Sequence, residues 1–226
     1  MRRPYPDRAA AGRALAEELP NELSGELRSA GGTALVLGLA RGGVPVAGPV
    51  ADALDADLDV LIVRKLGLPG QPELAMGAIA GVGDELQLVR NEPIAAEVSP
   101  ATLDAVRRDE ERELRRREHA YRGDRPPIDV RDRVVVLVDD GLATGATMRA
   151  AVEAVRRKQP ARVIVAVPVG GVESCRRLSR VADQVVCAWI PQYFTAVGQA
   201  YRDFSPVTDD EVRAVLAERT ARRPGG

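Results

Sequence analysis

Strand-sized aliphatic runs alternate along the chain with segments that place apolar residues at helical spacing. The aliphatic runs predict buried strands over residues 33–39, 58–63, 134–138, 162–169 and 184–188. The segments between them predict helices over residues 7–19, 44–54, 145–158 and 171–180, with a break in the chain at Gly31 and Gly32. Alternating strands and helices indicate an α/β fold with a mostly parallel sheet and helices on both faces.

Residues 64–98 have a less regular pattern. Glycines and prolines between Gly67 and Pro72 indicate a loop. Residues 77–80 and 85–89 indicate a hairpin that turns around Gly83.

A long charged helix is predicted after this region. Ser99 is a plausible N-cap with Pro100 at the first helical position, and the helix is expected to reach about Tyr121. Its arginines alternate with acidic residues, which is typical of an exposed helix rather than of a nucleic-acid-binding arm. Residues 208–211 (TDDE) have capping-box spacing and predict a terminal helix.

No stretch of the sequence has the composition of a linker. We therefore expect a single domain over residues 1–226, with a mobile cover at residues 66–121 and a C-terminal flap, or hood, at residues 188–226. The loop-like part of the cover, residues 66–83, is the candidate lid.

Composition and charge disfavour several classes of function. The chain has 226 residues, of which 45% are hydrophobic and 29% charged, which is typical of a folded domain. Its net charge of −1 disfavours nucleic-acid binding, which usually needs a basic excess. The 2 cysteines are too few for a disulfide framework or a zinc site. No aliphatic run approaches a membrane span and nothing resembles a signal peptide, so we expect a cytoplasmic protein without membrane or nucleic-acid partners.

The segment VVVLVDDGLATGAT, residues 134–147, is the most informative in the chain. An aliphatic strand ends in Asp139 and Asp140, a loop of small residues follows, and a helix then begins. Ligands of open parallel sheets bind beyond the carboxyl ends of the strands. Backbone amides at the start of a helix suit a phosphate group, and glycines let the backbone approach it closely.

The two carboxylates indicate what kind of phosphate ligand fits. They would repel a bare polyphosphate, but they are well placed to accept hydrogen bonds from sugar hydroxyls. A ribose 5-phosphate has a phosphate at one end and a vicinal diol near the other, so the segment predicts a site for that group. The predicted site residues are Asp139, Asp140, Gly141, Leu142, Ala143, Thr144, Gly145, Ala146 and Thr147.

This segment resembles the signature of the type I phosphoribosyltransferases, which is an aliphatic strand, two acidic residues, a short loop and T-G-x-T. In that family the acidic pair holds the ribose hydroxyls of phosphoribosyl pyrophosphate (PRPP), and the loop holds its 5-phosphate. The resemblance implies a transferase that uses PRPP and Mg²⁺ to ribosylate a nitrogenous base or amine with release of pyrophosphate. Residues 63–65, 73–78 and 194–204 are similar to a less characterised branch, which brings no substrate with it.

The segment LGLARGG, residues 37–43, looks like the pyrophosphate loop of the same family. The resemblance implies a cis peptide bond between Ala40 and Arg41. It also implies that Ala40, Arg41, Gly42 and Gly43 form the pyrophosphate site, with Arg41 and the backbone amides of the two glycines as its donors.

Two further basic residues and the metal follow from the same resemblance. Arg64 and Lys65, which come after the second strand, are secondary candidates for pyrophosphate binding, with plain surface charge as the alternative. Arg41, Asp139 and Asp140 are the expected catalytic residues, acting through positioning and electrostatics. The two aspartates are also expected to hold Mg²⁺ indirectly, together with the substrate.

The sequence narrows the range of possible acceptors but does not identify one. Ala143 stands where the 6-oxopurine enzymes of the family have an aspartate, so hypoxanthine and guanine are disfavoured. Trp189, Tyr193 and Phe194 are candidate residues for stacking on a base, with hydrophobic packing of the C-terminal flap as the alternative.

Other classes of function stay open at this point. A regulatory protein that binds PRPP or a nucleotide without turnover would keep the same motif. An unrelated nucleotide-binding protein is disfavoured, because the chain contains no GxxxxGK[ST], GxGxxG or GxSxG. Dimers are common in the family, so a homodimer is one expectation for the oligomeric state.

Overall fold

The computed structural model describes residues 4–19 and 34–222. The predicted break at Gly31 and Gly32, and the first residue of the strand predicted from residue 33, lie outside the described residues. Among the helices that are described, none combines the length and the apolar character needed to cross a membrane.

A parallel sheet of five strands, in the order β2-β1-β6-β7-β8, forms the centre of the structure. The strands are β1 (Leu35–Leu39), β2 (Asp57–Leu61), β6 (Val134–Val138), β7 (Arg162–Val167) and β8 (Gln184–Cys187). Each predicted aliphatic run overlaps one of them, because a strand covered on both faces carries apolar side chains at successive positions. The predicted parallel α/β sheet is therefore confirmed.

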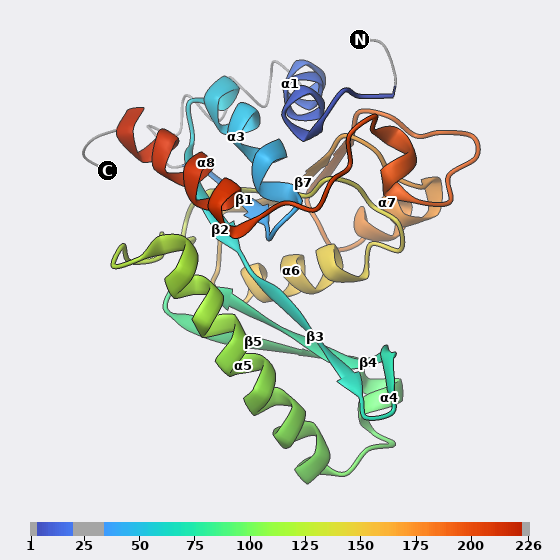
Figure 1. The fold of residues 1–226 in the computed structure, drawn as a ribbon. Coiled ribbons are helices and arrows are strands. Elements are labelled where there is room, and N and C mark those ends of the chain that lie inside the picture. The colour runs from blue at the N-terminus through green and yellow to red at the C-terminus, as the bar shows by residue number, and fades with distance from the viewer. Residues whose placement is uncertain (1–3, 20–33, 223–226) are drawn as a thin grey trace.

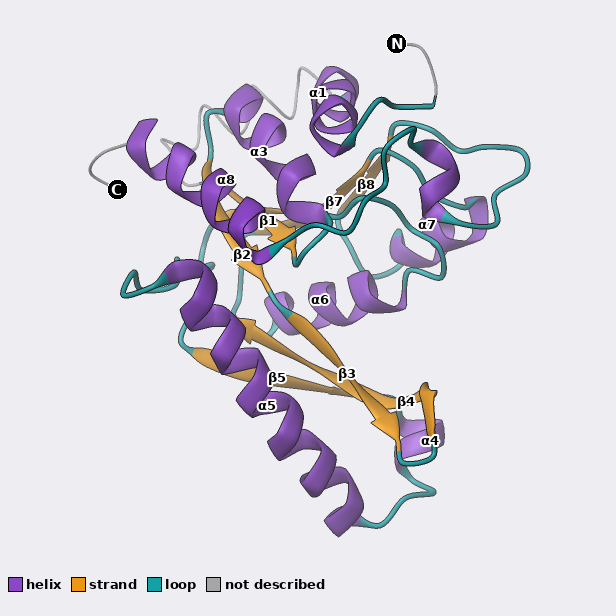
Figure 2. Cartoon of the chain, in the orientation of Figure 1, coloured by secondary structure: helices purple, strands orange, loops and turns teal. Residues whose placement is uncertain are grey.

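Helices cover both faces of this sheet (Figures 1 and 2). The helices on one face are α1 (Arg8–Glu18), α3 (Gly43–Leu54) and α8 (Asp209–Arg222), and those on the other are α6 (Ala146–Arg156) and α7 (Val172–Leu178). Alternate residues of each strand enter the two cores, because successive side chains of a strand point to opposite faces. In β6, Val136 and Val138 belong to the core with α3 and α8, and Val135 and Leu137 to the core with α6.

A second, antiparallel sheet lies where the sequence pattern predicted mainly a loop. It consists of β3 (Val63–Leu68), β4 (Gln71–Val82) and β5 (Glu85–Arg90), and a short helix, α4 (Glu92–Ala95), follows it. The predicted hairpin is confirmed as β4 and β5, but the predicted loop shrinks to a turn at Pro69 and Gly70. The strand predicted to end at Val63 is also corrected, because the chain leaves the first sheet after Leu61 and enters the second at Val63.

The second sheet lies between α6 and the long helix α5 (Pro100–Arg122), as Figure 1 shows. Leu114 of α5 is fully buried and belongs to the core that contains α3 and α8, whereas Ala80 of β4 belongs to the core that contains α6. Both cores thus continue from the first sheet into the second.

The predicted helix starts are confirmed by their capping contacts. The Thr102 amide donates to the Ser99 hydroxyl at 3.1 Å, at the start of α5. At the start of α8, the Thr208 amide donates to the Glu211 carboxylate at 2.7 Å and the Glu211 amide donates to the Thr208 hydroxyl at 3.2 Å. This reciprocal pair is a capping box.

Candidate functional site

The two sequence motifs meet at the carboxyl edge of the first sheet. β1 and β6 are parallel neighbours, so the loop after β1 and the acidic pair after β6 emerge side by side. A Cβ atom on Gly42 would lie 2.2 Å from Asp140 Oδ2, and one on Gly43 would lie 2.5 Å from the Val138 carbonyl oxygen. Gly42 has an ordinary helical φ of −60°, so a larger residue there would be opposed by the nearby carboxylate and not by the backbone conformation.

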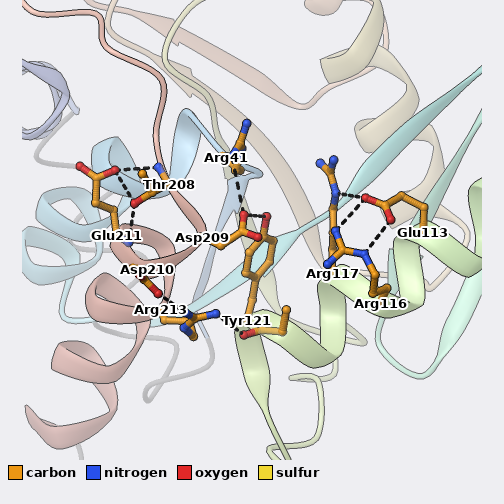
Figure 3. Close-up of polar contacts among 11 residues, drawn as sticks. Arg41, Glu113, Arg116, Arg117, Tyr121, Thr208, Asp209, Asp210, Glu211 and Arg213 are labelled. Atoms are coloured by element: carbon orange, nitrogen blue, oxygen red, sulfur yellow. Dashed lines mark hydrogen bonds and ion pairs between the residues drawn. The ribbon is translucent and has the colours of Figure 1, made fainter.

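The peptide bond between Ala40 and Arg41 is cis, as the resemblance implied. The Arg41 guanidinium is about half exposed and lies 3.7 Å from the Asp209 carboxylate, which also accepts a hydrogen bond from the Tyr121 hydroxyl at 2.9 Å (Figure 3). Burial and the bond to Asp209 raise the pKa of Tyr121 to about 12, so the phenol stays protonated. Arg41 is therefore held through a partly exposed ion pair at 3.7 Å, with much of its guanidinium open to solvent.

Asp139 and Asp140 have different surroundings although they are adjacent. Asp139 Oδ1 accepts the Asp140 amide at 2.9 Å, and no other hydrogen bond reaches its carboxylate within the described part of the chain. Burial and the neighbouring Asp140 carboxylate raise the pKa of Asp139 well above its ordinary value. Burial also raises the pKa of Asp140, although the Arg8 guanidinium opposes this shift.

Arg8 is a site residue that the sequence did not indicate. Its Nε donates to Asp140 Oδ2 at 2.9 Å and its Nη1 donates to the Ser205 carbonyl at 2.8 Å. The guanidinium lies 4.0 Å from the centre of the Phe204 ring, a cation–π distance. With side-chain exposures of 11% for Arg8 and 15% for Asp140, this ion pair is largely shielded from water.

Tyr201 holds the same aspartate through the main chain. Its hydroxyl donates to the Asp140 carbonyl at 2.6 Å, and burial together with the Asp140 carboxylate raises the pKa of Tyr201. Tyr5 forms a parallel bridge with Tyr201, so segments from both ends of the chain converge on Asp140. The 194–204 segment was singled out by its sequence, but nothing local assigned this role to Tyr201.

The loop between β6 and α6 is anchored by α7. The Ser174 hydroxyl donates to the Ala143 carbonyl at 2.5 Å, and Arg177 Nη2 donates to the Thr144 carbonyl at 3.2 Å. Gly145 has a φ of +73°, a conformation that favours glycine. Since the loop carbonyls are held on the α7 side and the first amides of a helix lack intrahelical acceptors, the turn into α6 offers donors to an anion.

The loop between β6 and α6 is packed at its start and exposed in its second half. Gly141 lies against Val169 and Val197, since a Cβ there would approach their side chains to 2.9 and 2.6 Å. The Leu142 amide donates to the Val169 carbonyl at 2.9 Å. The exposed residues of the loop are Ala143, Thr144 and Ala146, and Thr147 is half-buried.

Arg64 and Lys65 lie on opposite faces of β3. Arg64 Nε donates to Glu110 of α5 at 2.6 Å. Lys65 lines a small cavity of about 90 Å³ together with Thr147 at the first turn of α6. No hydrogen bond or ion pair among the described residues joins either side chain to the loop at residues 40–43, so their binding of pyrophosphate stays a prediction.

The three aromatic candidates have different exposures. Trp189 is half-buried and its ring packs edge-on against Tyr5, with the ring centroids 6.4 Å apart. Phe194 is half-buried against the same aromatic cluster, whereas Tyr193 is 85% exposed. Packing thus explains the positions of the Trp189 and Phe194 rings. Contact between any of the three rings and an acceptor stays a prediction.

Comparisons with known proteins agree with this arrangement. A family model described as the phosphoribosyl transferase domain matches residues 6–198. Two Mycobacterium tuberculosis proteins, named "Putative phosphoribosyl transferase Rv0571c" and "Putative phosphoribosyl transferase MT0597", are each 46% identical over 214 residues, which is 94% of this chain. The chain spans 46% of the length of each of these relatives.

A protein of known crystal structure is also similar over its whole length. TT1426 of Thermus thermophilus is 44% identical in sequence and superposes with a TM-score of 0.79. The matched region covers 96% of this chain and 99% of the TT1426 chain. The family model covers most of the described fold, including both motifs at the sheet edge. The chain therefore belongs to the phosphoribosyl transferase domain family, the type I phosphoribosyltransferases.

Proposed function

We propose that this protein is an enzyme that transfers the phosphoribosyl group of PRPP to a nitrogenous base or amine and releases pyrophosphate. One observation carries the proposal, which is the direct contact between Gly42 and the Asp140 carboxylate. Gly42 and Asp140 are 98 positions apart in the sequence, yet the loop after β1 and the acidic pair after β6 form one surface. A ligand with a pyrophosphate and a ribose diol fits such a surface.

The residues present have separate roles in this proposal. Arg41 and the amides of Gly42 and Gly43 bind the pyrophosphate and stabilise the charge that grows on it as the bond from C1 to oxygen breaks. Asp139 and Asp140 accept hydrogen bonds from the ribose hydroxyls and orient the ring. The acceptor nitrogen then forms its bond to C1 and loses its proton.

The 5-phosphate has its own site in this proposal. The backbone amides between Thr144 and Thr147 and the two threonine hydroxyls donate to its oxygens. The α7 contacts to the carbonyls of Ala143 and Thr144 keep the loop in this orientation.

The acidic pair fits a bound Mg²⁺ that is shared with the substrate. The described residues contain no group of three or more His, Cys, Asp or Glu side chains that could hold a metal alone. Mg²⁺ keeps several waters and binds one or two carboxylates together with substrate oxygens. This matches Asp139, whose carboxylate forms no ion pair with the described residues, and its neighbour Asp140. When bound, Mg²⁺ would neutralise charge on the pyrophosphate oxygens.

The proposal is tested by calorimetry with PRPP and Mg²⁺, followed by an assay of pyrophosphate release with a panel of purine, pyrimidine and amine acceptors. We expect micromolar PRPP binding in the wild type and none in the double variant Asp139→Asn, Asp140→Asn. Asp84→Asn is the matched control, because Asp84 is 85% exposed and pairs with Lys158 beyond the other end of α6.

Each outcome has a distinct meaning. Release with one acceptor names the substrate, and binding without release from any acceptor would favour a regulatory protein that senses PRPP. Absence of PRPP binding to folded wild-type protein would refute the proposed site.

A further inference from the structure

The two cysteines of the chain lie next to each other behind the loop between β6 and α6, residues 139–145, which is the phosphate loop of the proposed function. Cys175 belongs to α7 and is 8% exposed, and Cys187 ends β8 and is half-buried. A Cβ on Gly170 would lie 3.0 Å from the Cys175 sulfur and 3.3 Å from the Cys187 sulfur, so the two sulfurs are at most about 6.3 Å apart. Neither cysteine is in a disulfide in this structure.

The thiols also interact with each other. The Cys187 thiol donates to the Trp189 carbonyl at 3.3 Å, and the Cys175 sulfur lies on the same side of Gly170. The hydrogen bond from Cys187 lowers the pKa of the Cys175 thiol. A lowered pKa increases the fraction of thiolate, which is the form that reacts with oxidants.

We propose that Cys175 and Cys187 form a reversible intrachain disulfide when the protein meets a peroxide. The peroxide oxidises one thiolate to a sulfenic acid and leaves as water. The second thiolate then attacks that sulfur, so the sulfur–sulfur bond forms as the sulfur–oxygen bond breaks, and a second water leaves. In total two thiols and one hydrogen peroxide give one disulfide and two waters, and a dithiol reductant reverses the reaction.

The disulfide would act on the phosphate loop through short contacts. Leu142 of that loop forms a bridge with Gly170, the residue between the two sulfurs. Ser174, next to Cys175, donates to the Ala143 carbonyl at 2.5 Å. Formation of the bond would tie α7 covalently to the end of β8 and so constrain the Ser174 anchor that α7 carries.

The pairing of the cysteines does not depend on the proposed function, whereas the effect on PRPP rests on it. The expected effect is a loss of PRPP affinity of about fivefold or more on oxidation, restored by dithiothreitol. Cys175→Ser and Cys187→Ser cannot form the bond, so their affinity is expected to be unchanged after mild peroxide treatment.

The full chain is treated with hydrogen peroxide at low protein concentration and examined by intact mass and non-reducing peptide mapping. The expected product has lost two hydrogens and contains a linked peptide with Cys175 and Cys187. Oxygen addition on separate cysteines, or links only between two chains, would overturn the proposal. The wild-type reaction decides this even where a serine variant fails to fold.

Calorimetry with PRPP and Mg²⁺ on the same samples tests the coupling. Equal affinity of the reduced and the disulfide-linked protein would refute the effect on the loop. If the reduced protein binds no PRPP, the proposed function fails, while a disulfide found by mass spectrometry stands.

Discussion

Replacing Gly42 with alanine is expected to weaken PRPP binding without disturbing the fold. The backbone of Gly42 has φ −60° and ψ −33°, which any L-residue adopts, so alanine introduces no backbone strain. The added Cβ would lie 2.2 Å from Asp140 Oδ2, whereas Cβ contacts under 3.0 Å essentially never occur. The carboxylate must therefore retreat by about 0.8 Å, the difference between these two distances.

This retreat affects the ion pair behind the site. Asp140 Oδ2 is the same atom that accepts Arg8 Nε at 2.9 Å, so a shift of this size pushes the carboxylate into its partner or breaks the bond. A hydrogen bond to a charged group contributes about 1.5–3 kcal/mol, which corresponds to roughly 10- to 150-fold in PRPP affinity if the ribose contact is lost with it.

The assay is calorimetry with PRPP and Mg²⁺, with thermal unfolding measured on the same samples. Gly48→Ala is the matched control, because Gly48 lies in α3 and an added Cβ would meet only the Val215 side chain, at 3.2 Å. A folded Gly42→Ala protein that binds PRPP as tightly as the wild type would show that the Asp140 position does not matter for the ligand.

Three further changes test other parts of the structure. Arg8→Met leaves Asp140 unpaired and is expected to weaken PRPP binding by about 1.5–3 kcal/mol, with Arg8→Lys intermediate; equal affinities in calorimetry would contradict this. Asp139→Asn is expected to raise the melting temperature at pH 7. Folding raises the pKa of the Asp139 carboxyl, so the folded wild-type protein loses stability as the pH rises through that pKa, and the variant avoids this loss. The gain in melting temperature should vanish in melting curves at low pH, and a gain that does not change with pH would argue against this reasoning. Leu114→Ala removes a fully buried side chain between α5 and β4 and is expected to lower the free energy of unfolding by about 2–5 kcal/mol in denaturant titration, against no change for the exposed Arg112→Ala.

The features that were predicted correctly depend on local patterns. The β6 run is aliphatic at every position because both faces of the strand are covered, and this needs no knowledge of distant residues. The N-cap at Ser99 and the capping box at Thr208 each involve residues only three positions apart. The cis peptide bond at Ala40 followed from family resemblance rather than from any physical pattern.

The part of the second sheet before the predicted hairpin, β3 and the start of β4, was missed because its small residues make contacts that are not local. A Cβ on Gly67 would lie 2.7 Å from the Pro72 carbonyl oxygen, and one on Gly77 would lie 2.4 Å from the Val89 carbonyl oxygen. Both glycines permit close packing of neighbouring strands, yet Gly67, which stands among prolines and another glycine, looks in the sequence like the glycine of a loop. Their partners come from other strands, so the sequence pattern around each glycine could not distinguish the two cases.

The two aspartates of the motif are not equivalent, and the sequence alone could not show this. Asp140 is fixed by Arg8, 132 residues away, and by Tyr201, 61 residues away, so its environment exists only in the folded chain. Asp139 forms no ion pair with any described residue, and burial together with the neighbouring Asp140 carboxylate raises its pKa although Arg8 opposes this shift, so its charge is poorly compensated. In the proposed function this unmet charge is what a ribose hydroxyl or a substrate-bound Mg²⁺ satisfies, whereas Asp140 and Arg8 form a neutral pair that adds little repulsion toward the phosphates of PRPP. Replacing Asp140 alone should therefore destabilise the protein more than replacing Asp139 alone, since losing the Asp140 carboxylate also leaves the shielded guanidinium of Arg8 without its partner.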